Sequence, residues 1–264
     1  MRMMNIASGS SGNATYVGSG STHILIDSGI SRKRILEGLK KLELSLDDLS
    51  AVLVTHEHYD HISSLAMLEK AAQIPVYSTA GTASVLLGKG ILTEESGLLH
   101  TIGKDEAFCI GDLEVTALGT SHDAADPVCF RISGRESSCA VVTDLGVYDD
   151  HLVDSLKGLS AVMLEANHDI RMLETGPYPY PLKMRIAGKK GHLSNEVSGQ
   201  LLAKLLHDDM RYIALGHLSK KNNHEELARM SVAYEIDTGV QGYHASDFRI
   251  DVADQEHGTQ IYEF

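Results

Sequence analysis

The sequence contains no tryptophan, and aromatic residues make up only 5% of its 264 residues. Aliphatic side chains must therefore supply most of the core, and a hydrophobic fraction of 43% is ordinary for a globular protein. No apolar run approaches the roughly 18 to 20 residues that span a bilayer. Residues 1–9 become polar and rich in glycine and serine too soon to hold the apolar stretch of a signal peptide. We therefore expect a cytoplasmic protein with no membrane partner.

Cysteine is also scarce. Cys109, Cys129 and Cys139 each lie in a strand-like apolar run, and no two of them form a CxxC pair. An odd number of cysteines without metal-ligand spacing indicates buried free thiols in a reducing compartment, and it argues against a disulfide framework.

An excess of positive charge is missing as well. The net charge is −13, which argues against indiscriminate binding of nucleic acid, because counterion release needs clustered lysine and arginine. Residues 181–221 are an exception. They hold eight basic residues and three acids, a net charge of +5 that leaves −18 for the rest of the chain. Such a segment is either a local anion site or a set of solvated helix faces, and charge alone does not decide between them.

Buried strands and amphipathic helices alternate along the chain, which predicts a layered α/β fold with two sheets between helical layers. No repeat, low-complexity tract or linker interrupts residues 1–264, so we expect a single domain. The patterns predict strands over residues 15–17, 23–26, 51–54, 76–78, 107–110, 113–118, 128–132, 139–143 and 161–164, and a final strand pair over 248–252 and 260–262. They predict helices after Ser31 and over residues 63–73, 82–88, 149–156, 195–206 and 223–234.

Four potential metal ligands, His56, His58, Asp60 and His61, follow the apolar strand 51–54 within six residues. Each buried histidine or aspartate needs hydrogen-bond partners, so a core does not gather several without cause. Imidazole nitrogens and a carboxylate oxygen suit zinc, manganese or iron. His56 and His58 point the same way in an extended segment and can hold one ion, while Asp60 and His61 can hold a second. The helical HExxH pattern of zinc proteases does not apply, because Asp60 occupies its last position.

The run T-H-E-H-Y-D-H resembles the HxHxDH motif of the metallo-β-lactamase superfamily. The resemblance implies a four-layer αββα sandwich and places further site residues at strand ends. It implies that Asp27 does not bind metal itself but holds the metal ligands in position. It also implies two divalent metal ions, one bound by His56, His58 and His122 and one by Asp60, His61 and His217, with Asp144 bridging them. The sequence leaves open whether His192 takes the place of His217, and we prefer His217 because it ends a clearer strand.

Further segments resemble the YycJ/WalJ (VicX) group of that superfamily, among them S-G-S-S-G-N-A-T, L-E-A-N-H-D-I-R-M-L and L-G-H-L-S-K-K-N-N-H-E-E-L. The match runs from about Ile6 to Val232, and Ser64 is a departure at a position where many relatives have glycine. The resemblance implies a nuclease with 5′ to 3′ exonuclease activity on DNA. Two alternatives stay open: a hydrolase of small molecules (a cyclic phosphodiester, thioester or lactone) and a non-catalytic regulator that metal stabilises.

The residues themselves also favour a phosphate ester. Ser194 and Asn195 begin the helix 195–206, and a helix N-terminus beside Lys189 and Lys190 is a natural phosphate site. We expect His192 to protonate the leaving oxygen or to stabilise phosphoryl charge, and Glu165 to orient it.

Ser11 and Asn13 either line the mouth of the site or form a plain turn. The expected mechanism is two-metal hydrolysis, in which ions roughly 3.5 to 4 Å apart lower the pKa of a bridging water and align the resulting hydroxide with phosphorus. Asp60 and His58 are then essential to turnover.

Overall fold

The computed structural model describes all 264 residues and contains two seven-stranded sheets. The first sheet has the order β14-β1-β2-β3-β4-β5-β6, and the second has the order β13-β12-β11-β10-β9-β8-β7. The first consists of β1 (Arg2–Ala7), β2 (Ala14–Gly18), β3 (His23–Ile26), β4 (Ala51–Leu53), β5 (Val76–Thr79), β6 (Leu99–Ile102) and β14 (Tyr262–Glu263). The second consists of β7 (Ala107–Ile110), β8 (Leu113–Gly119), β9 (Val128–Ser133), β10 (Ser138–Val142), β11 (Ala161–Glu165), β12 (Tyr212–Gly216) and β13 (Ile250–Val252).

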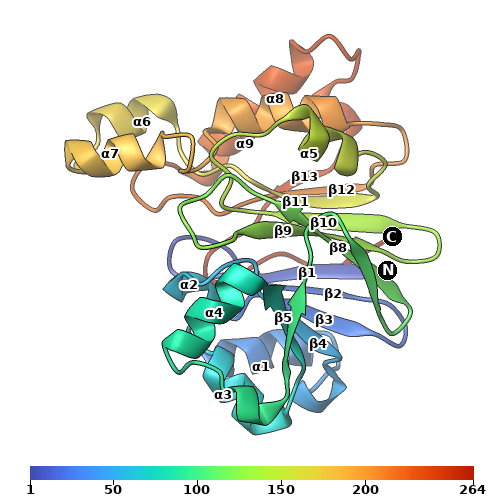
Figure 1. Cartoon of the computed structure of the whole chain (residues 1–264). Helices are drawn as coiled ribbons and strands as arrows, with labels where there is room; N and C mark the ends of the chain where they lie inside the picture. Colours follow the sequence, from blue (N-terminus) through green and yellow to red (C-terminus); the bar gives the residue numbers. More distant parts are fainter.

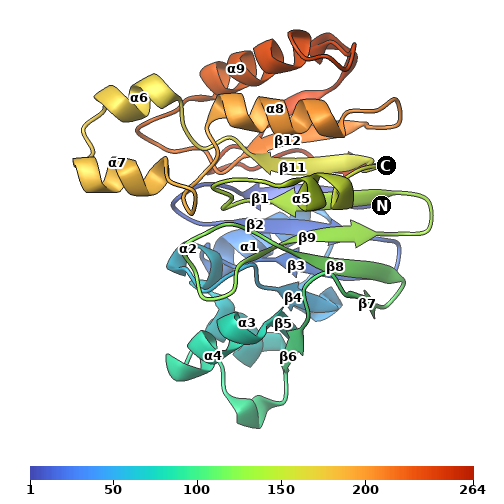
Figure 2. The same cartoon turned by 45° about the horizontal axis from the view of Figure 1, so that its top comes forward.

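Helices cover the outer face of each sheet, and this completes four αββα layers (Figure 1). On the first sheet lie α1 (Arg32–Lys41), α2 (Tyr59–Ile62), α3 (Leu65–Ala72) and α4 (Ala80–Gly88). On the second lie α5 (Asp150–Ser155), α8 (Asn195–Leu205) and α9 (Glu225–Asp237), while α6 (Ile170–Thr175) and α7 (Tyr180–Ile186) project from its edge (Figure 2). The predicted four-layer arrangement is confirmed.

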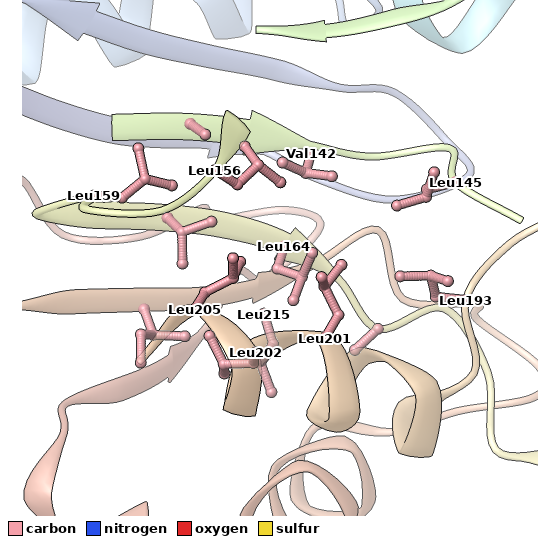
Figure 3. Packing of buried hydrophobic residues seen from close by; sticks show 14 of the residues in the cluster. Val142, Leu145, Leu156, Leu159, Leu164, Leu193, Leu201, Leu202, Leu205 and Leu215 are labelled. Carbon is pink, nitrogen blue, oxygen red and sulfur yellow. The ribbon is translucent and has the colours of Figure 1, made fainter. Parts of the chain in front are cut away.

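Three separate hydrophobic clusters fill the spaces between these layers. One lies between the two sheets and includes Phe130, and the other two lie between each sheet and its helices. In the cluster under the second sheet, Leu201, Leu202 and Leu205 of α8 point toward strand residues such as Leu164 (Figure 3). The side chains are mainly aliphatic, as the shortage of aromatic residues requires.

Local sequence explains why the elements near the site begin where they do. The hydroxyl of Ser31 accepts a hydrogen bond from the backbone N–H of Arg34 and caps α1, as predicted. Strand β4 is buried on both faces, which matches its continuous apolar run. Ser64 has φ −105°, so the position does not need glycine and serine fits.

Some predictions need correction. The two tail strands do not pair with each other, because β13 joins β12 in one sheet and β14 joins β1 in the other. Cys109 is exposed, whereas Cys129 and Cys139 are buried free thiols as expected. The patterns did not predict β1, β6, α6 or α7. None of the helices combines the length and the apolar character that crossing a membrane requires.

Candidate metal centre

The carboxyl ends of several strands meet at one edge of the sandwich and bring the predicted ligands together. Strand β8 is antiparallel to β9, which is antiparallel to β10, so β8 runs in the same direction as β10, β11 and β12. Strands β3 and β4 are parallel neighbours in the other sheet. The residues delivered by these ends are Asp27 after β3, His56 after β4, His122 after β8, Asp144 after β10, Glu165 at the end of β11 and His217 after β12.

The first group of candidate ligands consists of His56, His58 and His122, whose ligand atoms lie within 4.8 Å of one another. Nδ1 of His58 is 3.3 Å from Nε2 of His122. Nδ1 of His122 donates to the carbonyl oxygen of Gly191 at 3.1 Å, which leaves its Nε2 unprotonated and facing the other two rings. Nε2 of His56 is buried and has no hydrogen-bond partner.

The second group consists of Asp60, His61 and His217, with ligand atoms within the same 4.8 Å limit. Oδ2 of Asp60 is 3.6 Å from Nε2 of His61 and 3.9 Å from Nε2 of His217. Nδ1 of His61 donates to Asp27 and Nδ1 of His217 to Glu165, both at 2.7 Å. These carboxylates fix each ring so that Nε2 points into the cage, which is the arrangement expected around a metal-binding histidine.

Asp144 lies between the two groups. Its Oδ2 is 3.2 Å from Nε2 of His61, and its Oδ1 is 3.6 Å from Nε2 of His122 and 3.7 Å from Nε2 of His217. One carboxylate therefore faces ligands of both groups, as a bridging residue must.

These residues fit a pair of divalent cations. Two ligands that each lie 2.0–2.1 Å from a tetrahedral ion are about 3.4 Å apart, which is close to the 3.2–3.9 Å that separates several pairs of cage atoms. Buried polar atoms are nearly always satisfied, yet His56 Nε2, His217 Nε2 and Asp144 Oδ2 have no hydrogen-bond partner. Bound cations would supply the missing partners. The nitrogen and oxygen donors suit zinc, manganese or iron without selecting one.

The electrostatics favour positive charge inside the cage. Burial by itself lowers the pKa of the His217 ring, but the carboxylates of Asp144, Asp60 and Glu165 raise that pKa to about 10. Burial likewise opposes the charge of Asp144, yet His217 and His61 hold the pKa of this carboxyl well below its ordinary value. Buried anions at this edge therefore stabilise cations, whether protons or metal ions.

Three site residues adopt left-handed backbone conformations at the ends of their strands: Asp27 (φ 60°), Asp144 (φ 58°) and His217 (φ 56°). Each such conformation costs about 1–3 kcal/mol and persists only where its surroundings hold it. At His217, the backbone N–H donates to the Ser8 hydroxyl at 2.7 Å and the carbonyl oxygen accepts from the Asn167 amide at 2.8 Å. The turn after β12 is thereby fixed, and the His217 ring faces the cage.

Gly29 allows α2 to approach the loop after β3. A β-carbon at this position would lie 1.6 Å from the carbonyl oxygen of Asp60. The loop and the helix are also joined by a hydrogen bond from the Ser28 N–H to the carbonyl oxygen of His61 at 2.8 Å. The small residue therefore sets the position of two candidate ligands, Asp60 and His61.

Glu165 contacts His192, as predicted, and it also contacts His217, which the sequence did not predict. Its Oε1 accepts from Nδ1 of His192 at 2.8 Å and from Nδ1 of His217, while its Oε2 accepts from the backbone N–H groups of Leu145 and Leu193. We expect Glu165→Gln to weaken metal binding by about 10- to 100-fold, because ring orientation is lost.

The same substitution points an amide N–H₂ at backbone donors or at the histidines, so we also expect it to destabilise the protein by about 1–3 kcal/mol. Metal titration and thermal unfolding measure the two effects. Unchanged metal affinity in Glu165→Gln would show that the carboxylate does not position His217.

The predicted phosphate site at the N-terminus of α8 needs correction. The Ser194 hydroxyl caps the helix by accepting from the Val197 N–H, and the Asn195 N–H donates to the carbonyl oxygen of His168. Asn195 is fully buried, and its amide pairs with Asn223. This helix end is therefore closed. Lys189 and Lys190 are exposed and lie outside the lining of the cleft described below.

The predicted pair Ser11 and Asn13 separates in the structure. Ser11 is exposed and does not line the cleft, whereas its neighbour Ser10 does. Asn13 is buried; its Oδ1 accepts from the Gly9 N–H, and its Nδ2 lies 3.1 Å from Nε2 of His61. Asn13 therefore contacts His61, a member of the second group of candidate ligands.

A cleft of about 220 Å³ opens onto the cage. His58, Asp60, His122, Asp144, His192 and His217 form its polar floor. Its walls include residues that the sequence did not mark as site residues: Ser10, Asp123, Asn167, Tyr178, Leu182, Arg185, Ile186, Gly191 and Ser219. Arg185 belongs to the basic segment 181–221, but nothing in the sequence predicted the helix that brings it here.

Comparisons with known proteins agree with this fold. Residues 22–217 match the family model described as "Beta-lactamase superfamily domain". The chain is 36% identical to "Exodeoxyribonuclease YycJ" of Bacillus anthracis over 258 residues. This alignment covers 97% of this chain and 96% of that protein. It is 32% identical over 262 residues to "Exodeoxyribonuclease WalJ" of Streptococcus pneumoniae serotype 2, with coverage of 98% and 96%. The crystal structure of the metallo-β-lactamase fold protein YhfI from Bacillus subtilis superposes with a TM-score of 0.74 at 17% identity, over 100% of this chain and 99% of that one.

Proposed function

Because this chain belongs to the metallo-β-lactamase superfamily, we propose that it is a dinuclear metal-dependent phosphodiester hydrolase that acts as a 5′ to 3′ exonuclease on DNA. The observation that carries the chemistry is the cage itself, in which three buried ligand atoms have no partner and Asp144 faces both groups. The full-length similarity to two exodeoxyribonucleases supports DNA as the substrate.

Two divalent cations in the cage would supply a hydroxide nucleophile at neutral pH, by lowering the pKa of a shared water, and would neutralise charge on the scissile phosphate. The protein's own residues then have limited tasks. Seven side chains would hold the cations, and the left-handed turns at Asp144 and His217 fix the directions of two of these side chains. Neutralisation in the cage explains how a chain with a net charge of −13 accepts a polyanion.

His192 is the proposed proton donor to the leaving oxygen. It lines the cleft, its side chain is 19% exposed, and its Nδ1 donates to Glu165. This bond leaves Nε2 free to act as a general acid. His217, by contrast, is 2% exposed, and its Nε2 lies toward Asp60 and Asp144, which supports its role as the last metal ligand.

The two histidines should therefore respond differently to substitution. We expect His192→Ala to lower kcat by about 10²- to 10⁴-fold with the metal content unchanged, because only proton transfer is lost. We expect His217→Ala to lose bound metal together with activity, because a ligand is removed. Elemental analysis beside single-turnover kinetics separates the two roles, and the reverse pattern would make His192 the ligand.

The proposed function is tested by giving the metal-loaded protein end-labelled single- and double-stranded DNA, RNA, and a panel of thioester, lactone and cyclic phosphodiester substrates. We expect stepwise release of nucleotides from the 5′ end of DNA. Turnover of a small ester with no cleavage of any nucleic acid would support the alternative of a small-molecule hydrolase.

A further inference from the structure

Helices α6 and α7 project from the sandwich on the same side as α2, the helix that carries Asp60 and His61 (Figures 1 and 2). Three α7 residues, Leu182, Arg185 and Ile186, line the cleft over the cage, and Tyr178 from the preceding loop joins them. Helix α7 and the loop before it therefore form one wall of the site, and the candidate metal ligands form its floor.

This wall is joined firmly to the cage. The backbone N–H of His192 donates to the carbonyl oxygen of Ile186 at 2.9 Å, and the carbonyl oxygen of Gly191 accepts from the ring of His122. A β-carbon on Gly191 would lie 2.1 Å from the carbonyl oxygen of Ile186, so the chain after α7 passes too close for any larger residue. The end of α7 therefore keeps a fixed position relative to a metal ligand.

Arg185 is the only arginine or lysine among the residues that line the cleft. Its guanidinium forms a two-pronged ion pair with Asp123, with Nε 2.5 Å from Oδ2 and Nη2 3.2 Å from Oδ1. The same Oδ1 is 3.4 Å from Nε2 of His122. One carboxylate oxygen therefore contacts both the guanidinium and the cage, so a phosphate bound by Arg185 would lie beside a phosphate bound in the cage.

The guanidinium can exchange this partner for a substrate. The Arg185 side chain is 58% exposed, and the Asp123 side chain is 31% exposed, so solvent and ligands reach the pair. Arginine binds phosphate in the same bidentate geometry as carboxylate. A phosphate in the cleft would replace the Asp123 carboxylate as the anionic partner of Arg185, so the guanidinium would keep a partner throughout.

The rest of the wall suits a sugar and a base. Tyr178, Leu182 and Ile186 offer the aromatic and apolar surface on which an unpaired nucleotide packs. Nζ of Lys221 lies 5.7 Å from the centre of the Tyr178 ring, so a second cation borders the same surface. A cleft of about 220 Å³ is below the ~300 Å³ at which pockets for drug-sized ligands begin, so its size suits one unpaired nucleotide better than a base pair.

We propose that this wall is a subsite for a single unpaired nucleotide, in which Arg185 binds the phosphate adjacent to the scissile one and Tyr178 and Leu182 pack against the base and sugar. The inference rests on the proposed function, because it assumes that the cage cleaves phosphodiesters. It adds that the substrate enters as an unpaired end.

The test compares Arg185→Ala with the wild-type metal-loaded enzyme on two substrates. One is 5′-labelled single-stranded DNA, and the other is bis(p-nitrophenyl) phosphate, whose single phosphate has no neighbour. We expect the variant to raise KM for DNA by about 10- to 100-fold, since a charge-assisted contact is lost. The dependence of DNA binding on salt should also weaken by one phosphate contact. Hydrolysis of the small diester should stay within about twofold of wild type.

Two further variants sharpen the result. Arg171→Ala removes an exposed arginine from the neighbouring helix α6, outside the cleft lining, and should leave KM for DNA unchanged. Arg185→Lys keeps the positive charge but cannot make the two-pronged contact with a phosphate. It should therefore recover only part of the affinity for DNA that Arg185→Ala loses.

The inference is overturned if Arg185→Ala binds and cleaves DNA as the wild type does, or if it loses activity on both substrates equally. If the wild-type enzyme cleaves neither substrate, the proposed function itself fails.

Discussion

Replacing His58 with alanine should reduce phosphodiester cleavage by on the order of 10³-fold or more, and it should leave the fold intact. A metal ion contributes several kcal/mol of transition-state stabilisation, and each 1.36 kcal/mol changes the rate about tenfold. His58 is half-buried at the cleft, so its removal opens no cavity in any of the three hydrophobic clusters. Asp60→Ala should behave in the same way, because the Asp60 carboxylate belongs to the second group of candidate ligands, with His61 and His217.

A matched control separates loss of a ligand from loss of any histidine. His257 is exposed and lies far from the cage in sequence, and His257→Ala should keep full activity. Circular dichroism and thermal unfolding report whether each variant folds. Substantial turnover by a folded His58→Ala protein would remove the first group of ligands from the mechanism.

Removing the metal should abolish activity and lower Tm. The cage places buried anions and unpartnered ligand atoms side by side, and these are left uncompensated without cations. At a metal concentration 100 times Kd, one bound ion stabilises the folded state by about 2.7 kcal/mol. For a protein of this size each kcal/mol shifts Tm by about 2–4 °C, so one ion should be worth about 5–10 °C and two ions more.

Scanning calorimetry with and without a chelator measures this shift, and adding back zinc, manganese or iron should restore both Tm and turnover. The His58→Ala protein provides the control, because its first group is incomplete and its shift should be smaller. Identical Tm values for the chelated and metal-loaded wild type would contradict a cage built around cations.

The sequence was most informative where several ligands lie close together in the chain. His56, His58, Asp60 and His61 fall within six residues after one strand. The grouping of His56 with His58 follows from the alternation of side chains in an extended segment, whereas Asp60 and His61 lie in the short helix α2. His122, Asp144 and His217 are separate in sequence, and only the resemblance to a known family, through the order of strand ends, associated them with the cluster.

Other features depend on tertiary contacts that no local pattern reveals. Asn195 has the chemistry of a helix-capping residue, but its burial against Asn223 is set by how α8 and α9 pack. Glu165 was expected to hold His192, and the structure shows that it also holds His217. Helices α6 and α7 are only six and seven residues long, too short for a clear apolar period, so the wall containing Arg185 was not predicted.

The proposed reaction requires that the cage hold two cations before DNA is cut. Metal-free protein can be titrated with a divalent ion while bound metal per chain and release of nucleotides from end-labelled DNA are measured on the same samples. We predict that activity rises to a plateau at two ions per chain. Full activity with one ion, or cleavage by protein that binds none, would contradict it.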